Sequence, residues 1–270
     1  MFSVHSQHRS LWRQIIAVII VLSSTIYYGC SKHSGSPQGQ LAENEKPQQL
    51  LPAKIEVAGT STSLSYQGNS PRIEEIKRSD GYGQKVSYSV DGVITMLEKL
   101  RSEVLYEYLE YYADQKGVIS AAQKFVLDTR TNSFIADNSY TFSYDDHKRL
   151  YAIETYNRLN TLISNEERKY SESGNLVEIS QKPGSGPELK RTYTFDDKQG
   201  CFKNVSYADL LALETDMELM NSRFNNRLSS VTTNSSTSTV SYSYQYNNAG
   251  YPTAITEKGA GTKSFKISYG

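Results

Sequence analysis

The feature that most constrains the fold of this chain is a pattern in which aromatic residues occupy every second position and a short polar turn follows. The clearest copy spans residues 242–255, and a second spans residues 140–153. Period-two alternation places Tyr242, Tyr244 and Tyr246 on one face of a β-strand and the polar residues between them on the other face. The Asn, Asp and Gly residues that follow tolerate the conformations that reverse the chain. Each copy is therefore predicted to be a β-hairpin with one aromatic face.

Further copies of the hairpin pattern occur along most of the chain. Residues 169–179 and 193–200 carry clear copies, and weaker copies centre on Tyr66, Tyr88, Tyr112 and Phe224. Hairpins that recur every two to three dozen residues form an antiparallel meander. A sheet of that many strands must curl, close or split to protect its faces and edges. The predicted fold class is all-β, an antiparallel meander of Tyr-rich hairpins that forms a curled sheet, a half-barrel or a barrel.

Two stretches depart from the hairpin pattern. Residues 96–112 fit both a helical stripe and a strand-like alternation, and the flanking repeats favour strands. Residues 207–220 are rich in Leu, Met and Ala, and Asp209 follows Ser206 at the spacing of a helix capping box. We therefore expect a short helix near residues 207–220.

The first 29 residues have the layout of a secretory leader. A basic stretch precedes an apolar run from Ile15 to Leu22, which is shorter than the roughly 20 residues needed to cross a bilayer, and a short tail ends at Gly29. Gly29 followed by Cys30 resembles the bacterial lipobox, in which the cysteine thiol receives a diacylglycerol. The resemblance implies lipidation of Cys30 and attachment to a membrane. Ser31 is not the aspartate that retains lipoproteins at the inner membrane, so the outer membrane is favoured.

The sequence predicts three parts: a lipoprotein signal peptide at residues 1–29, a flexible tether at 30–60 and a β-hairpin repeat domain at 61–270. The tether is expected because residues after Cys30 are rich in Ser, Gln, Glu and Pro and show little periodicity. Such a segment cannot bury enough apolar area to offset the entropy of ordering it.

Net charge excludes a general attraction to nucleic acid. The whole chain has 29 basic and 29 acidic side chains, and removing the leader takes away Arg9 and Arg13 but no acid, which leaves 27 against 29. A nearly neutral, slightly acidic domain has no electrostatic pull toward phosphate backbones. We therefore expect no nucleic-acid partner.

The sequence offers no catalytic or metal-binding constellation, and no motif for a cofactor. Beyond the leader its histidines are His33 and His147, too few for a Ser-His-Asp or His-based zinc site. The acid pairs at 145–146 and 196–197 lack the spacing of a known calcium loop and are expected to shape turns. Cys201 is expected to be a packed, unreactive residue. A carboxylate pair for glycoside hydrolysis is defined by distance in space, and the sequence leaves it open.

Two segments carry a family resemblance. The run Tyr193-Thr-Phe-Asp-Asp-Lys-Gln-Gly-Cys-Phe-Lys-Asn204 and the later run Tyr246-Asn-Asn-Ala-Gly-Tyr-Pro-Thr-Ala-Ile255 are similar to segments of a lipoprotein family from Bacteroides and its relatives. That family is of unknown function and is described as having a porin-like β fold. The resemblance implies an envelope location and a fold class but no catalytic residue. The hairpins also resemble the Tyr-Asp repeats of Rhs-type shell proteins, which use many more units.

These observations predict a non-enzymatic, lipid-anchored protein of the bacterial envelope that binds a glycan, a peptide or an envelope protein, or acts structurally. Tyr242, Tyr244 and Tyr246 are the candidate ligand-binding residues, because Tyr rings combine apolar faces with polar edges. In the competing interpretation these rings form the core of the sheet. Two alternatives remain: a carrier of a lipid or other apolar ligand in a half-closed barrel, and a small shell-like or interaction module of the Rhs type.

Overall fold

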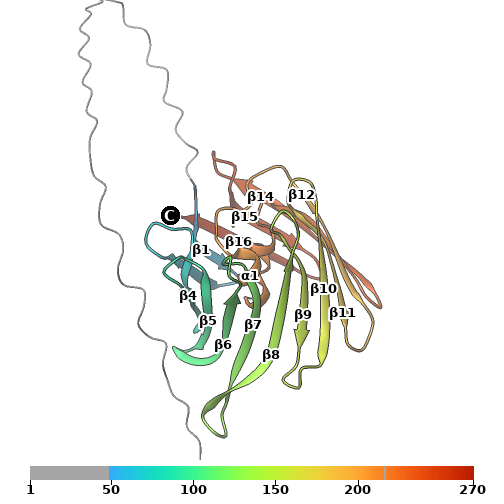
Figure 1. Ribbon diagram of the computed structural model, residues 1–270. Helices are drawn as coiled ribbons and strands as arrows, with labels where there is room; N and C mark the ends of the chain where they lie inside the picture. Colours follow the sequence, from blue (N-terminus) through green and yellow to red (C-terminus); the bar gives the residue numbers. More distant parts are fainter. Residues whose placement is uncertain (1–48, 216) are drawn as a thin grey trace, which may run out of the picture. The chain divides into compact units, whose positions relative to one another are not determined.

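The computed structural model describes residues 49–215 and 217–270 (Figure 1). Over these residues 16 antiparallel strands close into a barrel, because each strand pairs with its neighbours in sequence and the first strand, β1, pairs with the last, β16. The fold is the all-β antiparallel meander predicted from the sequence, in its closed form. Closure removes both edges of the sheet, so each of these strands has a neighbour on both sides.

The first eight strands are β1 (Pro52–Val57), β2 (Thr60–Tyr66), β3 (Ile73–Arg78), β4 (Tyr82–Tyr88), β5 (Ile94–Arg101), β6 (Val104–Ala113), β7 (Ile119–Asp128) and β8 (Ser133–Tyr144). The other eight are β9 (Leu150–Tyr156), β10 (Leu162–Tyr170), β11 (Leu176–Pro183), β12 (Leu189–Phe195), β13 (Arg227–Thr233), β14 (Thr237–Tyr246), β15 (Pro252–Lys258) and β16 (Thr262–Tyr269). The strands predicted over residues 96–112 are confirmed as parts of β5 and β6.

The strand that closes the barrel lies within the predicted tether. Residues 52–57 of the expected segment 30–60 form β1, which pairs with β2 on one side and β16 on the other. The barrel therefore begins before residue 61, and this strand turns a curled sheet or half-barrel into a closed one. Residues 1–48, which include the predicted leader, Cys30 and most of the predicted tether, lie outside the described residues.

The odd-numbered strands begin with the same burial pattern. Their first residue and the residue three positions on are both buried, as in Ile73 with Ile76 and Leu150 with Ile153. Strict alternation would bury residues two apart, and the extra residue is taken up by a register shift where each such strand pairs with an even-numbered neighbour. A β-bulge of this kind bends a strand and increases its twist, and bulges are common at the rims of barrels. In residues 96–112 a further register shift, between Lys99 and Leu100, buries Leu97 and Leu100 three positions apart, which fits part of the helical stripe.

Tyrosines at the ends of even-numbered strands point inward and hold the barrel wall together. Their hydroxyls donate to the carbonyl of the first residue of the preceding strand, in the pairs Tyr66 to Pro52, Tyr88 to Ile73, Tyr170 to Leu150 and Tyr269 to Pro252. A ring buried among apolar side chains needs a partner for its hydroxyl, and these carbonyls supply it. The high Tyr content therefore has a structural cause in this barrel.

Six of the turns between described strands share one pattern of hydrogen bonds and backbone conformation, which we call the turn design. The first turn residue donates its N–H to the carbonyl of the fifth, its side-chain oxygen accepts from the N–H of the fifth, and the fourth residue has a positive φ. The turns begin at Ser89, Asp114, Asp145, Asn157, Ser171 and Asn247. This confirms that the acid pair at 145–146 shapes a turn.

The connection from β12 to β13 is an expanded version of the same turn. Asp196 donates its N–H to the carbonyl of Asn226, and its carboxylate accepts from the N–H groups of Lys198 and Asn226. These contacts match those of Asp145 with His147 and Arg149. Where the other turns have three residues between the first and fifth positions, this one has residues 197–225, which we call the plug.

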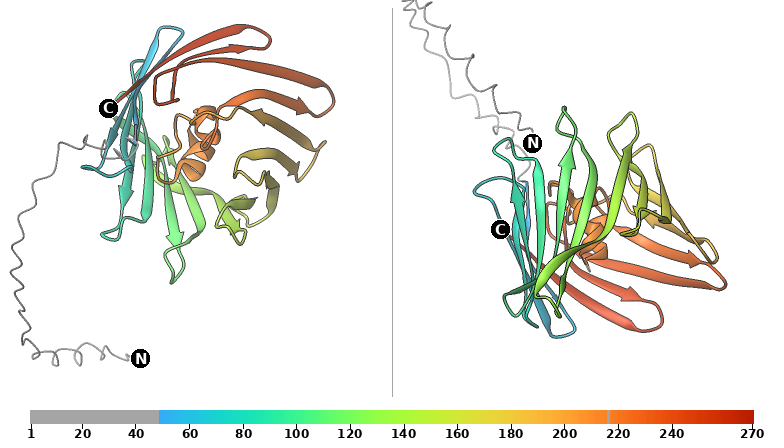
Figure 2. Two further views of the ribbon diagram at one scale, coloured as in Figure 1. Left: turned by 90° about the horizontal axis from the view of Figure 1, so that it is seen from above. Right: turned by 60° about the horizontal axis from the view of Figure 1, so that its bottom comes forward.

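The plug lies inside the ring of strands (Figure 2). It contains α1 (Ala208–Glu214) and the 3-10 helix η1 (Glu218–Asn221). Its side chains Phe202, Val205, Leu211 and Met220 are fully buried in one cluster with inward residues of the wall. Backbone hydrogen bonds tie the plug to the rim around it, from Ser206 to Pro71 and from Gln199 to Gly250, and a third bond, from Gly200 to Phe224, lies within the plug.

The predicted helix near 207–220 is present but shorter, and its start differs from the prediction. Tyr207, not Ser206, precedes the first helical residue; it has a φ of 58°, and no side chain caps the helix. The Ser206 N–H donates to the carbonyl of Pro71 instead, so docking against the rim fixes the start of the helix. The capping box of Ser206 and Asp209 was therefore wrong.

Candidate functional site

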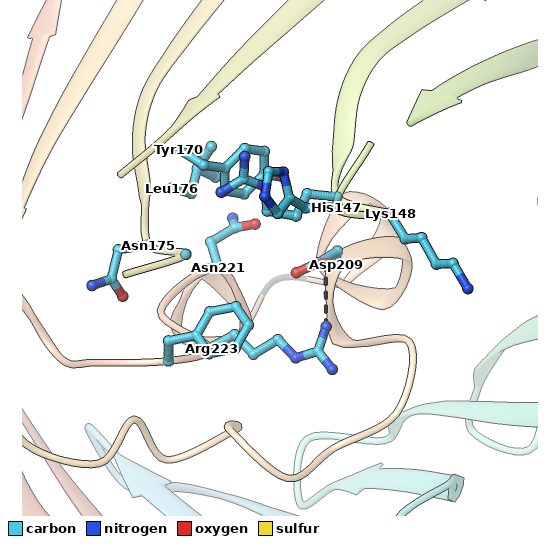
Figure 3. Close-up of a pocket in the computed structure, with 11 residues that line it drawn as sticks. His147, Lys148, Tyr170, Asn175, Leu176, Asp209, Asn221 and Arg223 are labelled. Atoms are coloured by element: carbon cyan, nitrogen blue, oxygen red, sulfur yellow. Dashed lines mark hydrogen bonds and ion pairs between the residues drawn. The ribbon is translucent and has the colours of Figure 1, made fainter. Parts of the chain in front are cut away.

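A pocket of about 250 Å³ lies where the plug meets two turns of the barrel rim (Figure 3). We call it the rim pocket. One side comes from the β8–β9 turn, from the end of β10 and from the β10–β11 turn, and the other side comes from the plug. The residues that matter most for its chemistry are His147, Tyr170, Asp209, Asn221, Arg223 and Phe224.

The wall side of the rim pocket is held rigidly. Arg149 makes two contacts of 2.7 Å with the carboxylate of Asp145 and donates to the carbonyl of Ser171 at 3.2 Å. Its guanidinium also lies 4.9 Å from the centre of the Tyr170 ring, in a cation–π contact. Two turns and one strand are thus locked together, which gives the pocket a fixed surface.

The plug side of the rim pocket presents polar atoms from both helical segments. Asp209 of α1 lies 3.5 Å from the guanidinium of Arg223, and the amide oxygen of Asn221 at the end of η1 points toward the Asp209 carboxylate (Figure 3). The Asn221 Oδ1 and Arg223 Nε atoms are buried and have no hydrogen-bond partner among the described residues. Buried polar atoms of this kind are expected to find partners, so the site has unused hydrogen-bonding capacity.

Lys148 departs from the turn design at the rim pocket. It has a φ of 61°, and the equivalent position of the other five turns is glycine or asparagine. The left-handed conformation costs a residue with a β-carbon roughly 1–2 kcal/mol, which Gly avoids and Asn tolerates better. Among the six equivalent turns, the one at the rim pocket therefore carries backbone strain that the four glycine turns avoid.

Two groups at the wall side of the pocket have shifted pKa values. Burial raises the pKa of Tyr170 to about 12, so its hydroxyl stays neutral. Burial alone would raise the pKa of the Asp145 carboxyl, but its hydrogen bonds from Arg149 bring it below the ordinary value.

Across the described residues no group of three His, Cys, Asp or Glu side chains could hold a metal ion. In the same part of the chain no helix is long and apolar enough to span a membrane.

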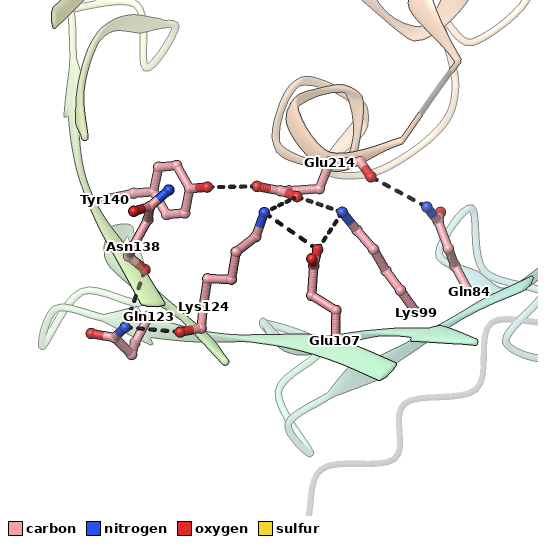
Figure 4. A network of polar contacts seen from close by, with 8 residues as sticks. All are labelled: Gln84, Lys99, Glu107, Gln123, Lys124, Asn138, Tyr140 and Glu214. Atoms are coloured by element: carbon pink, nitrogen blue, oxygen red, sulfur yellow. Dashed lines mark hydrogen bonds and ion pairs between the residues drawn. The ribbon is translucent and has the colours of Figure 1, made fainter. Parts of the chain in front are cut away.

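A second polar site lies between the plug and the inner face of the barrel (Figure 4). Glu214, at the end of α1, lies 2.6 Å from the Lys99 ammonium and 3.2 Å from that of Lys124, and both ammonium groups also contact Glu107. The Tyr140 hydroxyl donates to Glu214 at 2.8 Å. We call these five residues the inner ion cluster.

The inner ion cluster keeps its charges although it is largely buried. Burial has the largest effect on the pKa of Glu214 and raises it, but Lys99 and Lys124 together lower the pKa below its ordinary value. Burial lowers the pKa of Lys99, and Glu214 and Glu107 more than reverse that effect. With each charge partnered, the cluster fastens the plug to strands β5–β8 and offers no vacant charge to a ligand.

The predicted ligand-binding tyrosines are brought together on β14, away from the rim pocket. Tyr242 and Tyr244 pack against the apolar core, and the rings of Tyr244 and Tyr246 stack with centres 5.9 Å apart. Tyr246 is 36% exposed, and its hydroxyl donates to Asp196 at the base of the plug. The two inner rings serve the core, as the competing interpretation expected, and ligand binding by the three tyrosines stays a prediction. Cys30, the predicted lipidation site, lies outside the described residues.

The pocket residues that the sequence analysis missed lie far apart in sequence. His147 and Tyr170 are on wall hairpins, and Asp209, Asn221 and Arg223 are in a segment read only as a short helix. Two signals were present: a lysine at the glycine position of one turn, and a long interval between the hairpin copies that end near residue 195 and begin again near 227. Cys201 lies in the plug and is 2% exposed, with a pKa raised to about 12 by burial, which confirms a packed thiol.

Comparison with known proteins shows structural but not sequence-level similarity. No protein-family model matches the sequence, and no curated protein matches it. One similar solved structure is a porin-like protein from Bacteroides uniformis ATCC 8492, with 14% identity and a TM-score of 0.45, covering 81% of this chain and 98% of that chain. Another is a porin-like protein from Bacteroides vulgatus ATCC 8482, with 12% identity and a TM-score of 0.44, covering 82% and 99%.

Proposed function

We propose that this chain is a non-enzymatic, lipid-anchored protein of the bacterial cell envelope that binds a small polar ligand in the rim pocket. The observation that carries the proposal is the convergence of polar groups from the plug and from two wall turns on one concave site. Two of those groups, Asn221 Oδ1 and Arg223 Nε, are buried without a partner among the described residues. A ligand that supplied their hydrogen bonds would gain affinity from them.

The membrane partner in this proposal is reached through Cys30. The leader and the Gly29–Cys30 junction support a lipid anchor, and Ser31 favours the outer membrane, at its periplasmic face or at the cell surface. An anchor leaves the barrel free to stand in water and meet a glycan, a peptide or another envelope protein.

The outer wall of the barrel supports a position outside the lipid. Along β1, Lys54 and Glu56 alternate with buried Ile55 and form an ion pair on the outside. Along β14 the outward residues are Ser241, Ser243 and Gln245. Barrels that span membranes have an apolar outer band and a polar interior. On β1 and β14 this barrel instead has charged, hydroxyl and amide side chains outside, and its interior holds an apolar core around the plug together with the inner ion cluster.

The alternative function, transport of a lipid or other apolar ligand, requires a deep apolar cavity. Apolar plug residues, among them Phe202, Leu211 and Met220, occupy the apolar part of the barrel and are fully buried there. An apolar ligand would have to displace them. The geometry therefore favours binding at the rim.

A thermal-shift screen of the purified full chain against small polar compounds tests the proposal, because a ligand that binds only the folded state raises the midpoint of unfolding. The expected result is a hit that is lost in Asp209→Ala and retained in Asp197→Ala. Asp197 is a matched control because its carboxylate is 86% exposed and lies outside the pocket. A screen without hits, or hits unaffected by Asp209→Ala, would contradict the proposal.

A further inference from the structure

Charge pairing at the rim pocket indicates what kind of ligand it accepts. Arg149 is neutralised by Asp145, and Arg223 lies beside Asp209. Lys148 also lines the pocket, but its side chain points away from the centre (Figure 3). A charged ligand would have to compete with an existing ion pair and lose its own hydration. The electrostatics therefore favour a neutral ligand.

Hydrogen-bonding capacity narrows the chemistry further. The site presents acceptors in Asn221 Oδ1 and the Asp209 carboxylate, which point toward one another, and a buried donor in Arg223 Nε. The imidazole of His147 can act in either role. A ligand that satisfies this mixture must donate and accept from neighbouring atoms, which is the property of a hydroxyl group.

Size and an aromatic neighbour complete the description. Phe224 lines the pocket and lies against Gly174, at a distance where an added β-carbon would make ordinary contact with the ring. An aromatic face packs well on the C–H face of a sugar ring. The volume of about 250 Å³ is below the roughly 300–1,000 Å³ of pockets for drug-sized molecules. One or two small rings would fill it.

We propose that the rim pocket binds a neutral carbohydrate, with the hydroxyls of one sugar residue bridging Asp209, Asn221 and Arg223 and its apolar face on Phe224. The inference rests on the proposed binding function of the same pocket and names its ligand class. It also places the glycan site at the junction of plug and rim, away from the β14 tyrosines.

The test is a titration of the purified full chain, followed by NMR, with matched probes. One arm uses neutral sugars: glucose, galactose, N-acetylglucosamine and their disaccharides. The other arm uses charged relatives: glucose 6-phosphate, glucuronic acid and glucosamine. We expect at least one neutral probe to bind tenfold or more tightly than its charged relative. Tighter binding of the charged probes would overturn the carbohydrate assignment and leave the binding function standing. An absence of binding in both arms would overturn both.

Two variants locate the site in the same experiment. Asp209→Asn keeps the shape of the side chain but removes the charge beside Arg223. We therefore expect the affinity for the neutral sugar to fall about tenfold. Because Arg223 is then uncompensated, the same variant should bind glucuronic acid more tightly than the wild type does. Asp197→Asn, which changes an exposed carboxylate, should alter neither affinity. Equal effects of the two variants, or no gain for glucuronic acid, would overturn the placement of the site.

Discussion

At the scale of single residues, the structure explains which residue types occupy particular positions of the repeat. The fourth position of the shared turn requires a positive φ, and it is Gly92, Gly117, Gly174 and Gly250 in four copies and Asn160 in a fifth. Lys148 occupies that position beside the rim pocket. A residue that opposes its own backbone conformation is most simply explained by its surroundings.

Lys148→Gly should therefore stabilise the protein. Relief of the left-handed strain is expected to add about 1 kcal/mol to the free energy of unfolding, measured by denaturant titration. Lys148→Ala is the control, because it removes the charge but keeps the β-carbon and the strain, and it should change stability little. A glycine variant no more stable than the alanine variant would show that the turn is unstrained.

Glu214 should contribute far more to the free energy of unfolding than a carboxylate that lies between two lysines on the outer wall of the barrel. Glu214→Gln leaves the two lysines of the inner ion cluster with Glu107 alone, and we expect a loss of about 1–3 kcal/mol. Glu178 lies between Lys169 and Lys190 on the outer wall at 2.7 and 2.8 Å, and Glu178→Gln should cost less than about 1 kcal/mol. Comparable losses for the two variants would contradict the role of burial.

The pH dependence of the stability that Glu214 contributes follows from the directions in which the pKa values of Glu214 and Lys99 shift. The folded pKa of Glu214 is lowered, so its contribution is complete above the unfolded value of about 4.3 and is lost as the pH falls through the lowered value. The folded pKa of Lys99 is raised, so its contribution is lost only as the pH rises through a value above the usual 10.4 or so. Denaturation of wild type and Glu214→Gln should therefore differ between about pH 5 and 10 and converge in acid. A difference that persisted at pH 2 would contradict this account.

At the scale of elements, the plug is a long insertion into one of several equivalent turns. Replacing residues 197–225 by Asp-Ser-Gly would restore the short design between Asp196 and Asn226. We expect the product to lose most of its stability and to bind a hydrophobic dye, because the apolar inner wall loses its partners in the plug. A variant that unfolds like the wild type would show that the barrel does not depend on the plug.

Sequence reasoning found the hairpins because alternation and turn chemistry are local, but it missed relations set by long-range packing. A register shift between Lys99 and Leu100 changes the alternation to a spacing of three, which is why residues 96–112 were ambiguous. Strand β1 was missed because a single short strand beside a polar segment carries little periodicity of its own. The rim pocket was missed because His147 and Asp209 come together only after the plug folds into the barrel.

At the scale of the whole molecule, the barrel has a core filled by its own chain and a polar outer face along β1 and β14. Under the proposed function, attachment to a membrane depends on a lipid at Cys30. In a bacterial host the wild type should fractionate with membranes, and Cys30→Ser should be exported and recovered in the aqueous fraction. A Cys30→Ser variant that stayed with the membrane after high-salt washing would indicate that the barrel wall itself holds the lipid.

The central claim is that the plug and two rim turns form the binding site of this protein. Crystals of the full chain soaked with a library of small polar fragments, sugars included, test it most directly. The account predicts that bound fragments gather in the rim pocket, with atoms within hydrogen-bond distance of Asp209, Asn221 and Arg223. Fragments that gathered instead along Tyr242, Tyr244 and Tyr246, or nowhere on the barrel, would contradict it.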